Sequence, residues 1–213
     1  MCTRYNPIHD KSRLQKYFGM TPPAFLLGQA VWPGKSSAFI RKASDPGDTA
    51  KSSATRETLH GSFGLVPSWA VDTQIARQSY NARSETVAEK PCFREAWHRA
   101  QRCIIPIESF YEPDWRSGKA VPVRIAHAEG APLGIAGLWS SWEDDAGELL
   151  HSFAMLTVEA RKHPLINELH KLTDEKRMLL VLPPEHYDEW LFAAPKDSDK
   201  LLRHWPVELA ITQ

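Results

Sequence analysis

Cys2, the second residue of the chain, offers chemistry that most cysteines lack. If Met1 is removed, Cys2 carries an α-amine and a thiol on neighbouring carbon atoms. The amine titrates near about 8 and the thiol near about 8.5, so both reactive forms exist at neutral pH. The amine condenses with an aldehyde to a Schiff base, and the thiol then closes a five-membered thiazolidine ring. Because ring closure is intramolecular, we expect the product to outlast an open imine.

Polar residues such as Asn81, Glu112 and His170 have side chains that could support such a nucleophile, but their types alone do not distinguish them from other polar residues of the chain. Glu112 follows an apolar run, and a carboxyl that is partly buried there would titrate in the range useful for proton transfer. Asn81 offers both a hydrogen-bond donor and an acceptor, and His170 offers a proton near neutral pH. Each also has a structural interpretation, as a strand-end ion pair, a turn residue and a surface histidine. His163, seven residues earlier, competes with His170 for the histidine role.

Several motifs occur in a fixed order behind the start Met-Cys-Thr-Arg-Tyr. They are residues 63–69 (Phe-Gly-Leu-Val-Pro-Ser-Trp), 80–86 (Tyr-Asn-Ala-Arg-Ser-Glu-Thr), 102–112 ending in Phe-Tyr-Glu, 136–139 (Ala-Gly-Leu-Trp), 153–160 and 163–170. This series resembles the SOS response-associated peptidase (SRAP) family, the abasic-site processing proteins. The resemblance runs from residue 1 to about Leu182, and it rests on the order of the motifs rather than on any one of them.

The resemblance implies that Cys2 forms a covalent crosslink to abasic sites in single-stranded DNA, as part of the DNA damage response. Carried over by motif, the supporting residues are Asn81 in Asn-Ala-Arg, Glu112 in Phe-Tyr-Glu and His170 in the Leu-His that precedes Arg-Met. We expect Glu112 to move protons, Asn81 to hold the amine or the sugar, and His170 to protonate the sugar ring oxygen or stabilise the adjacent phosphate. Associated strand cleavage, crosslink reversal and peptidase activity are also implied.

Five residues are candidates for contacts with the DNA strand. Arg4 and Arg83 suit phosphate groups, because a guanidinium pairs with a phosphate through two hydrogen bonds. Trp69 and Phe63 could stack on bases beside the lesion, although Phe63 also fits a core position at a strand end. Thr157 could line the pocket through its hydroxyl.

The chain departs from the family pattern in several places, among them Pro113-Asp114-Trp115, where a tryptophan usually follows the glutamate directly, and Leu179, where a proline is usual. Thr3 replaces the usual glycine beside the nucleophile, which restricts the backbone there. Residues 30–34 (Ala-Val-Trp-Pro-Gly) occupy the region where Asn-x-Ala-Pro is familiar. Residues 171–176 separate His170 from Arg177-Met178, which usually follow almost at once. We expect these changes to affect the DNA context and rate more than the core chemistry.

Other functions remain open from the sequence. Cysteine amidohydrolases of the N-terminal-nucleophile class also begin Met-Cys, but their Cys-Gly-Ile start and Asn-Gly segment are missing here. A peptidase that uses Cys2 and His170, even only on Met1, is a second alternative. A module that binds single-stranded DNA without a covalent bond is a third.

The elements that must position these residues are mostly strands. Apolar runs predict strands at 37–41, 59–65, 102–107, 121–127, 133–139, 151–158 and 177–182. Helical patterns are fewer, at 93–100, 164–170, 184–193 and 197–204. The two kinds do not alternate, which favours an α+β fold with a mainly antiparallel, barrel-like β core flanked by short helices. We expect one domain over residues 1–213, an irregular stretch as far as Pro33, and a surface loop at 42–58.

Composition limits the class of protein. The 213 residues carry no net charge, but residues 1–125 hold 18 Lys and Arg against 11 Asp and Glu, which suggests a basic face. The three cysteines include no Cys-x-x-Cys pair, so we expect free thiols and no metal or other cofactor. No apolar run approaches the roughly 20 residues of a membrane helix. We expect a cytoplasmic, nucleoid-associated monomer.

Overall fold

A computed structural model describes residues 2–21, 30–43, 55–171 and 173–212 of the chain. Five strands close into a barrel: β5 pairs with both β2 and β7, β7 pairs with β8, β8 with β3, and β3 with β2. All of these pairings are antiparallel except β3 with β8. The expected α+β fold with a mainly antiparallel, barrel-like core is therefore confirmed.

The strands differ widely in length. The barrel strands are β2 (Ser36–Lys42), β3 (Arg56–Phe63), β5 (Arg102–Asp114), β7 (Leu133–Glu143) and β8 (Leu149–Glu159). Additional strands extend the sheet, namely β1 (Tyr5–Pro7), β4 (Asn81–Arg83), β6 (Val121–His127), β9 (Arg177–Leu179), β10 (Val181–Leu182) and β11 (Leu209–Thr212). The predicted strand at 177–182 is thus divided into β9, which pairs with β8, and β10, which pairs with β7.

The helices are short. They are α1 (Lys11–Phe18), α2 (Pro91–His98), α3 (Ile166–Leu169) and α4 (Tyr187–Phe192), with 3₁₀ turns at Thr73–Arg77, Pro184–His186 and Pro195–Leu201. The sequence did not indicate α1, because its interval was expected to be irregular. Its boundaries are nevertheless encoded locally: the Asp10 side chain accepts a hydrogen bond from the Ser12 N–H, and Gly19 ends the helix at φ 68°.

The expected surface loop at 42–58 is described only at its ends. Lys42 is the last residue of β2, and Arg56 begins β3, so the flanks of the segment belong to the sheet. Residues 44–54 lie outside the described residues.

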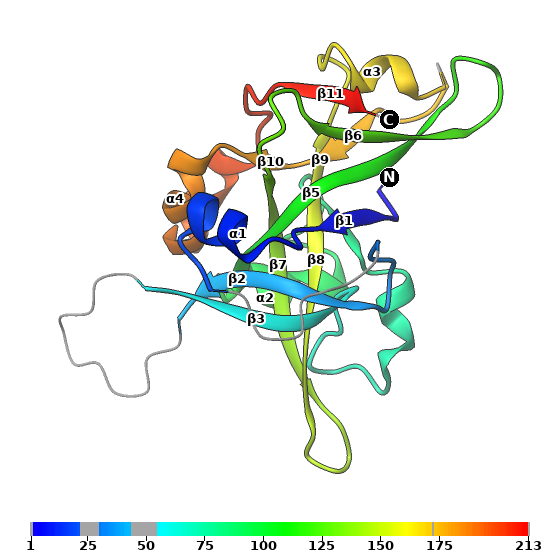
Figure 1. Cartoon of the computed structure of the whole chain (residues 1–213). Coiled ribbons are helices and arrows are strands. Elements are labelled where there is room, and N and C mark those ends of the chain that lie inside the picture. Colours follow the sequence, from blue (N-terminus) through cyan, green and yellow to red (C-terminus); the bar gives the residue numbers. More distant parts are fainter. Residues whose placement is uncertain (1, 22–29, 44–54, 172, 213) are drawn as a thin grey trace.

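Two of the short strands bring the start of the chain to the candidate site. Strand β1 pairs antiparallel with β5, with Tyr5 opposite Phe110, and β4 pairs in parallel with β8, with Asn81 opposite Met155. Figure 1 shows β1 and β5 side by side, with the N-terminus on the side of the molecule opposite α1 and α4. Neither strand was predicted, yet both carry or flank candidate site residues.

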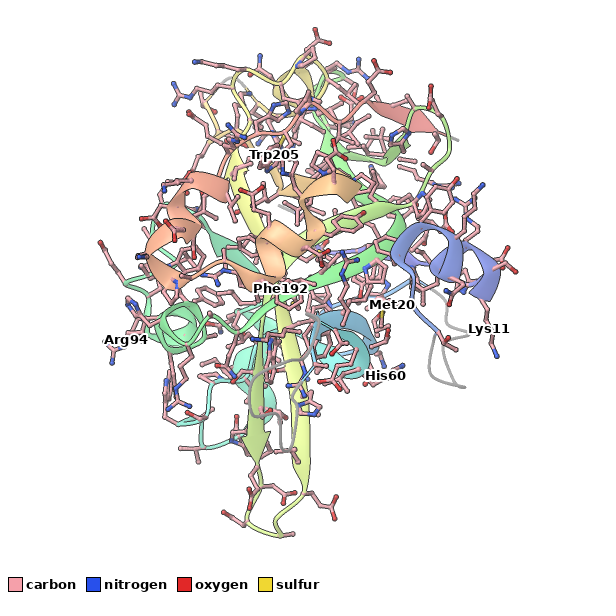
Figure 2. The ribbon with its side chains drawn as sticks, turned by 90° about the vertical axis from the view of Figure 1, so that its left-hand side faces the viewer. Lys11, Met20, His60, Arg94, Phe192 and Trp205 are labelled. Atoms are coloured by element: carbon pink, nitrogen blue, oxygen red, sulfur yellow. The ribbon has the colours of Figure 1, made fainter. Side chains whose placement is uncertain are left out.

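Figure 2 shows the side of the molecule that lies on the left in Figure 1, where Lys11 marks the start of α1 and Phe192 the end of α4. A cavity of about 360 Å³ on this side is lined by residues that include Tyr17, Leu182 and Tyr187. None of its lining residues belongs to the site predicted from the sequence. Among the described helices, none has both the length and the apolar character needed to cross a membrane.

Candidate functional site

Cys2 is buried next to the beginning of β1, with none of its surface exposed. Its Sγ donates a hydrogen bond to the Arg4 carbonyl oxygen, at 3.3 Å. The same carbonyl accepts a hydrogen bond from the Tyr111 N–H at 3.0 Å, so β5 fixes the backbone beside the nucleophile. The Asn81 Nδ2 donates to the Cys2 carbonyl oxygen at 2.8 Å. Thus β4 and β5 hold Cys2 from two directions, while the neighbouring Thr3 side chain is exposed.

Glu112 and His170 form the other half of the candidate site. The distance from Glu112 Oε2 to His170 Nε2 is 3.6 Å, and their side chains are only 1% and 7% exposed. Glu112 is close enough to Cys2 for its negative charge to disfavour the thiolate. The structure therefore brings together Cys2, Asn81, Glu112 and His170, four residues that are far apart in the sequence.

His170 is positioned by backbone contacts on both sides. It directly follows α3 in an extended conformation, and the Trp115 N–H donates to the Leu169 carbonyl at 2.8 Å. The Lys176 ammonium donates to the His170 carbonyl at 2.7 Å and also to the Lys171 carbonyl. The residues inserted after His170 thus fold back and support it. The sequence marked this segment as a departure, but nothing in it indicated that Lys176 would be buried.

His163 has a different role from His170. Its Nδ1 accepts hydrogen bonds from the backbone N–H groups of Leu165 and Ile166, both at 3.2 Å, at the start of α3. Its ring lies against His204, with the ring centroids 5.0 Å apart. Geometry therefore separates the two histidines: His163 stabilises the helix, and His170 faces Glu112.

Burial and the nearby Glu112 charge raise the pKa of the Cys2 thiol to about 12. At neutral pH only ~1 thiol in 10⁵ is then ionised. The thiol in this setting is therefore protonated before it reacts and is not a preformed thiolate. This state suits a reaction that begins at the amine and reaches the sulfur second.

The protonated state of Cys2 predicts a pattern of thiol alkylation. In the native protein at pH 8, iodoacetamide is expected to modify the partly exposed Cys92 first and Cys2 roughly tenfold or more slowly, because the thiolate is the reactive form. Raising the pH toward 12 should speed the reaction of Cys2. Peptide mass spectrometry measures the order, and the urea-unfolded chain is the control. Equal alkylation rates at Cys2 and Cys92 in the native protein would contradict a protonated Cys2 thiol.

Two buried polar atoms of the site lack a hydrogen-bond partner within the described part of the chain. They are Asn81 Oδ1, an acceptor, and His170 Nδ1. A buried polar atom left unpaired costs about 1–3 kcal/mol, so each such atom needs an explanation, and a bound group is one. Both belong to residues that the sequence selected.

Trp69 is placed where it could meet a ligand. Its side chain is 54% exposed, at the end of the segment that follows β3. This segment leaves the barrel at Gly64, whose φ of 123° and close approach to the Ala76 carbonyl exclude a side chain. The Ser152 hydroxyl accepts a hydrogen bond from the Val66 N–H at 2.8 Å and fixes the loop.

Phe63 and Thr157 are both buried side chains of the barrel strands. Phe63 has no exposed surface and packs against Tyr5, with ring centroids 5.3 Å apart, so it is a core residue unable to stack on a base. Thr157 is 1% exposed, and its hydroxyl accepts a hydrogen bond from Arg177 Nε at 3.1 Å. The expectation for Phe63 is corrected, because strand β3 directs its side chain into the interior. A contact of Thr157 with the pocket stays a prediction.

Arg83 is half exposed and ion-paired. Its Nη1 lies 3.0 Å from Glu175 Oε2, while Glu175 also binds the buried Arg177 at 2.8 Å. Arg177 Nη2 further contacts Glu85 at 2.9 Å. A phosphate at Arg83 would therefore compete with Glu175. Nothing in the sequence indicated that Arg177, at the start of β9, would be buried and pair with both Glu85 and Glu175.

Arg4 stacks on Tyr111, with its Cζ 3.4 Å from the ring centroid. No group of three or more His, Cys, Asp or Glu side chains suitable for a metal ion occurs among the described residues.

Comparison with known proteins identifies relatives along the whole chain. The sequence model of the SOS response associated peptidase (SRAP) family matches residues 1–213. The abasic site processing protein YoaM of Bacillus subtilis is 36% identical over 132 residues, which are 61% of this chain and 54% of YoaM. The abasic site processing protein HMCES of Xenopus tropicalis is 28% identical, over 68% of this chain and 48% of HMCES. The chain thus spans about half the length of these curated relatives.

Solved structures agree on the fold. A crystal structure of a protein from Bordetella bronchiseptica is 40% identical with a TM-score of 0.85, and the alignment covers all of both chains. A protein from Bacteroides thetaiotaomicron, 22% identical over all of this chain and 92% of its own, has a TM-score of 0.80 and shows the fold alone.

Proposed function

Because this chain belongs to the SOS response associated peptidase (SRAP) family, we propose that it captures abasic sites in single-stranded DNA through Cys2 once Met1 is removed. One observation carries the proposal: Cys2 is enclosed with an amide, a carboxyl and an imidazole, from Asn81, Glu112 and His170. The names of the curated relatives, abasic site processing proteins, support the choice of the aldehyde.

The first step opens the abasic sugar and forms an imine. His170 donates a proton to the ring oxygen, and the proton of the C1 hydroxyl passes through Glu112 back to His170, which exposes the aldehyde. The Cys2 amine then adds to the carbonyl carbon. Glu112 accepts the proton that leaves the amine and returns it to the hydroxyl, which departs as water. The buried Glu112–His170 pair, 3.6 Å apart, is suited to moving protons within the closed site.

The second step closes the thiazolidine ring. The thiol adds across the carbon–nitrogen double bond, so that a carbon–sulfur bond forms while the thiol proton moves to the nitrogen. Because the raised thiol pKa keeps the sulfur protonated until then, the amine acts first. One water is lost in the two steps together, and no oxidant or reductant is needed.

Asn81 orients the reactive residue. Its Nδ2 holds the Cys2 carbonyl, and its buried Oδ1 remains available to accept a hydrogen bond. In the processed protein the Cys2 amine is the donor that this arrangement fits. The exposed Trp69 is proposed to stack on a base, and Arg4 and Arg83 to attract phosphates.

The same environment weighs against the hydrolytic alternatives. A cysteine peptidase or amidohydrolase requires a thiolate, which is normally generated by a histidine paired with the sulfur. Here the described hydrogen bond of Cys2 Sγ goes to a backbone carbonyl, and Glu112 disfavours the thiolate. Strand cleavage and crosslink reversal use the same imine and are compatible with the proposed mechanism.

The proposal is tested with the Met1-free protein and a single-stranded oligonucleotide that contains one abasic site. An adduct that survives heating in denaturant is expected, and an oligonucleotide of the same sequence without the lesion should give none. Absence of the adduct in the wild-type protein would overturn the proposal. A non-covalent binding module predicts equal retention of both oligonucleotides, independent of Cys2.

A further inference from the structure

A row of three side chains crosses the sheet next to the nucleophile. Tyr5 pairs with Val31 on one side of β1 and with Phe110 on the other. One residue further along each strand, Arg4 therefore lies between Trp32 and Tyr111. Its guanidinium carbon is 3.4 Å from the centroid of the Tyr111 ring and 5.4 Å from that of the Trp32 ring. We call Trp32, Arg4 and Tyr111 the stacking row.

The inner end of the stacking row is fixed by hydrogen bonds. Asn6 Nδ2 donates to the Tyr111 hydroxyl at 3.3 Å and to the Ser109 hydroxyl at 2.9 Å. On the next strand Arg124 is opposite Tyr111, and its Nε donates to Ser109 at 3.1 Å. Aromatic and cationic side chains therefore alternate across four segments of chain. Such a pre-ordered surface needs little further ordering when a ligand binds.

The charge of Arg4 is not neutralised within the described part of the chain. Arg13, Arg41 and Arg116 each form an ion pair with a carboxylate, whereas Arg4 forms none there. Its Nε is buried without a hydrogen-bond partner among the described residues. Stacking uses the face of a guanidinium and leaves the N–H groups at its edge available for an anion.

The outer end of the stacking row is open. The Trp32 side chain is 47% exposed, an unusual state for the largest apolar side chain. An exposed indole next to an uncompensated guanidinium is the combination that binds unpaired nucleic acid, since bases stack on the ring and phosphates meet the cation. Cys2 donates its thiol hydrogen bond to the backbone of Arg4, so the middle of the stacking row adjoins the reactive centre.

We propose that the stacking row binds the unpaired strand beside the lesion, with a base stacked on Trp32 and a phosphate at Arg4. The assignment to a strand that carries a lesion rests on the proposed function, but strand binding itself does not. Trp32 belongs to residues 30–34, where this chain departs from the family pattern. The stacking row therefore distinguishes this chain from relatives that keep that pattern.

The test compares Trp32→Ala and Trp32→Phe with wild type, and uses Leu149→Ala as a matched control. Leu149 is 60% exposed and lies at the start of β8, next to the turn that joins it to β7. Fluorescence anisotropy measures binding of a lesion-free single-stranded oligonucleotide, and single-turnover kinetics measure the half-saturating concentration for crosslinking. Trp32→Ala is expected to raise the dissociation constant and the half-saturating concentration by about tenfold each. Trp32→Phe should raise them much less, because a phenyl ring still stacks.

The proposal also states which kinetic quantity the Trp32 substitution changes. The effect is expected in the half-saturating concentration rather than in the crosslinking rate at saturation. Arg4→Gln should make the slope of log affinity against log salt concentration shallower, by the amount that corresponds to the loss of about one phosphate contact. The proposal is overturned if Trp32→Ala binds the lesion-free strand as tightly as Leu149→Ala does, or if duplex and single strand lose affinity equally. Because lesion-free binding needs no crosslink, these results are independent of whether the proposed covalent reaction occurs.

Discussion

The Cys2→Ser variant is expected to form an imine with an abasic site but no durable adduct. Serine keeps the α-amine, so the first condensation still takes place. A hydroxyl is a much weaker nucleophile than a thiol toward the imine carbon, and the stabilising ring closure is lost. We expect the yield of heat-stable adduct to fall roughly 10³-fold or more, because the intramolecular thiol supplies that stabilisation.

The measurement uses two quenches of the same reaction. Heating in denaturant reports the thiazolidine, whereas sodium borohydride traps the imine. Cys2→Ser should be positive only with borohydride. The matched control Cys92→Ser should behave as wild type, since Cys92 lies in the first turn of α2, away from the described contacts of the site. A heat-stable adduct from Cys2→Ser in wild-type yield would show that the sulfur is not part of the linkage.

The Glu112→Gln variant is expected to slow crosslinking by roughly 10²–10⁴-fold, the range for loss of a general acid–base group. The substitution keeps the shape of the side chain and removes its charge. Because the Glu112 charge contributes to the raised pKa of the Cys2 thiol, that pKa should fall, although burial still holds it above the ordinary value. The thiol should therefore be alkylated faster at a fixed pH while crosslinking becomes slower.

These opposite changes separate a proton-transfer role from simple damage to the site. Single-turnover crosslinking and iodoacetamide labelling of Cys2 are measured on the same preparations. Glu108→Gln is the matched control, since Glu108 lies on the same strand but pairs with Arg13 at the surface. Wild-type crosslinking by Glu112→Gln would remove Glu112 from the mechanism, and unchanged labelling would contradict its electrostatic effect on the thiol.

The long strands were predictable because each carries its own apolar pattern. Strand β6 was predicted with the observed bounds, and β2, β5, β7 and β8 were recognised but proved longer. Strands β1 and β4 have three residues each, too few for a pattern, and they exist because β5 and β8 offer free edges. Their absence from the prediction matters, since they position the backbone around Cys2 and Asn81.

The reactive residues of the candidate site were predictable from the sequence, but several of the side-chain contacts around them were not. The motif order selected Cys2, Asn81, Glu112 and His170, which the fold brings together. It could not show that Phe63 points into the barrel, because an aromatic residue at a strand end can face either side.

Contacts made by single side chains across the fold lie beyond sequence patterns. Lys176 supports the His170 backbone from within the insertion, and Trp32 stacks on Arg4 from a segment with no regular structure. Neither position belongs to a periodic element, so only the folded arrangement relates each of them to the site.

The intact mass of the crosslinked product tests the central claim most directly. The predicted mass is that of the protein without Met1, plus the abasic oligonucleotide, minus one water, with no gain of two hydrogens after borohydride treatment, because a closed thiazolidine has no imine to reduce. An adduct that retains Met1, or one that takes up two hydrogens, would contradict capture by the aminothiol of Cys2.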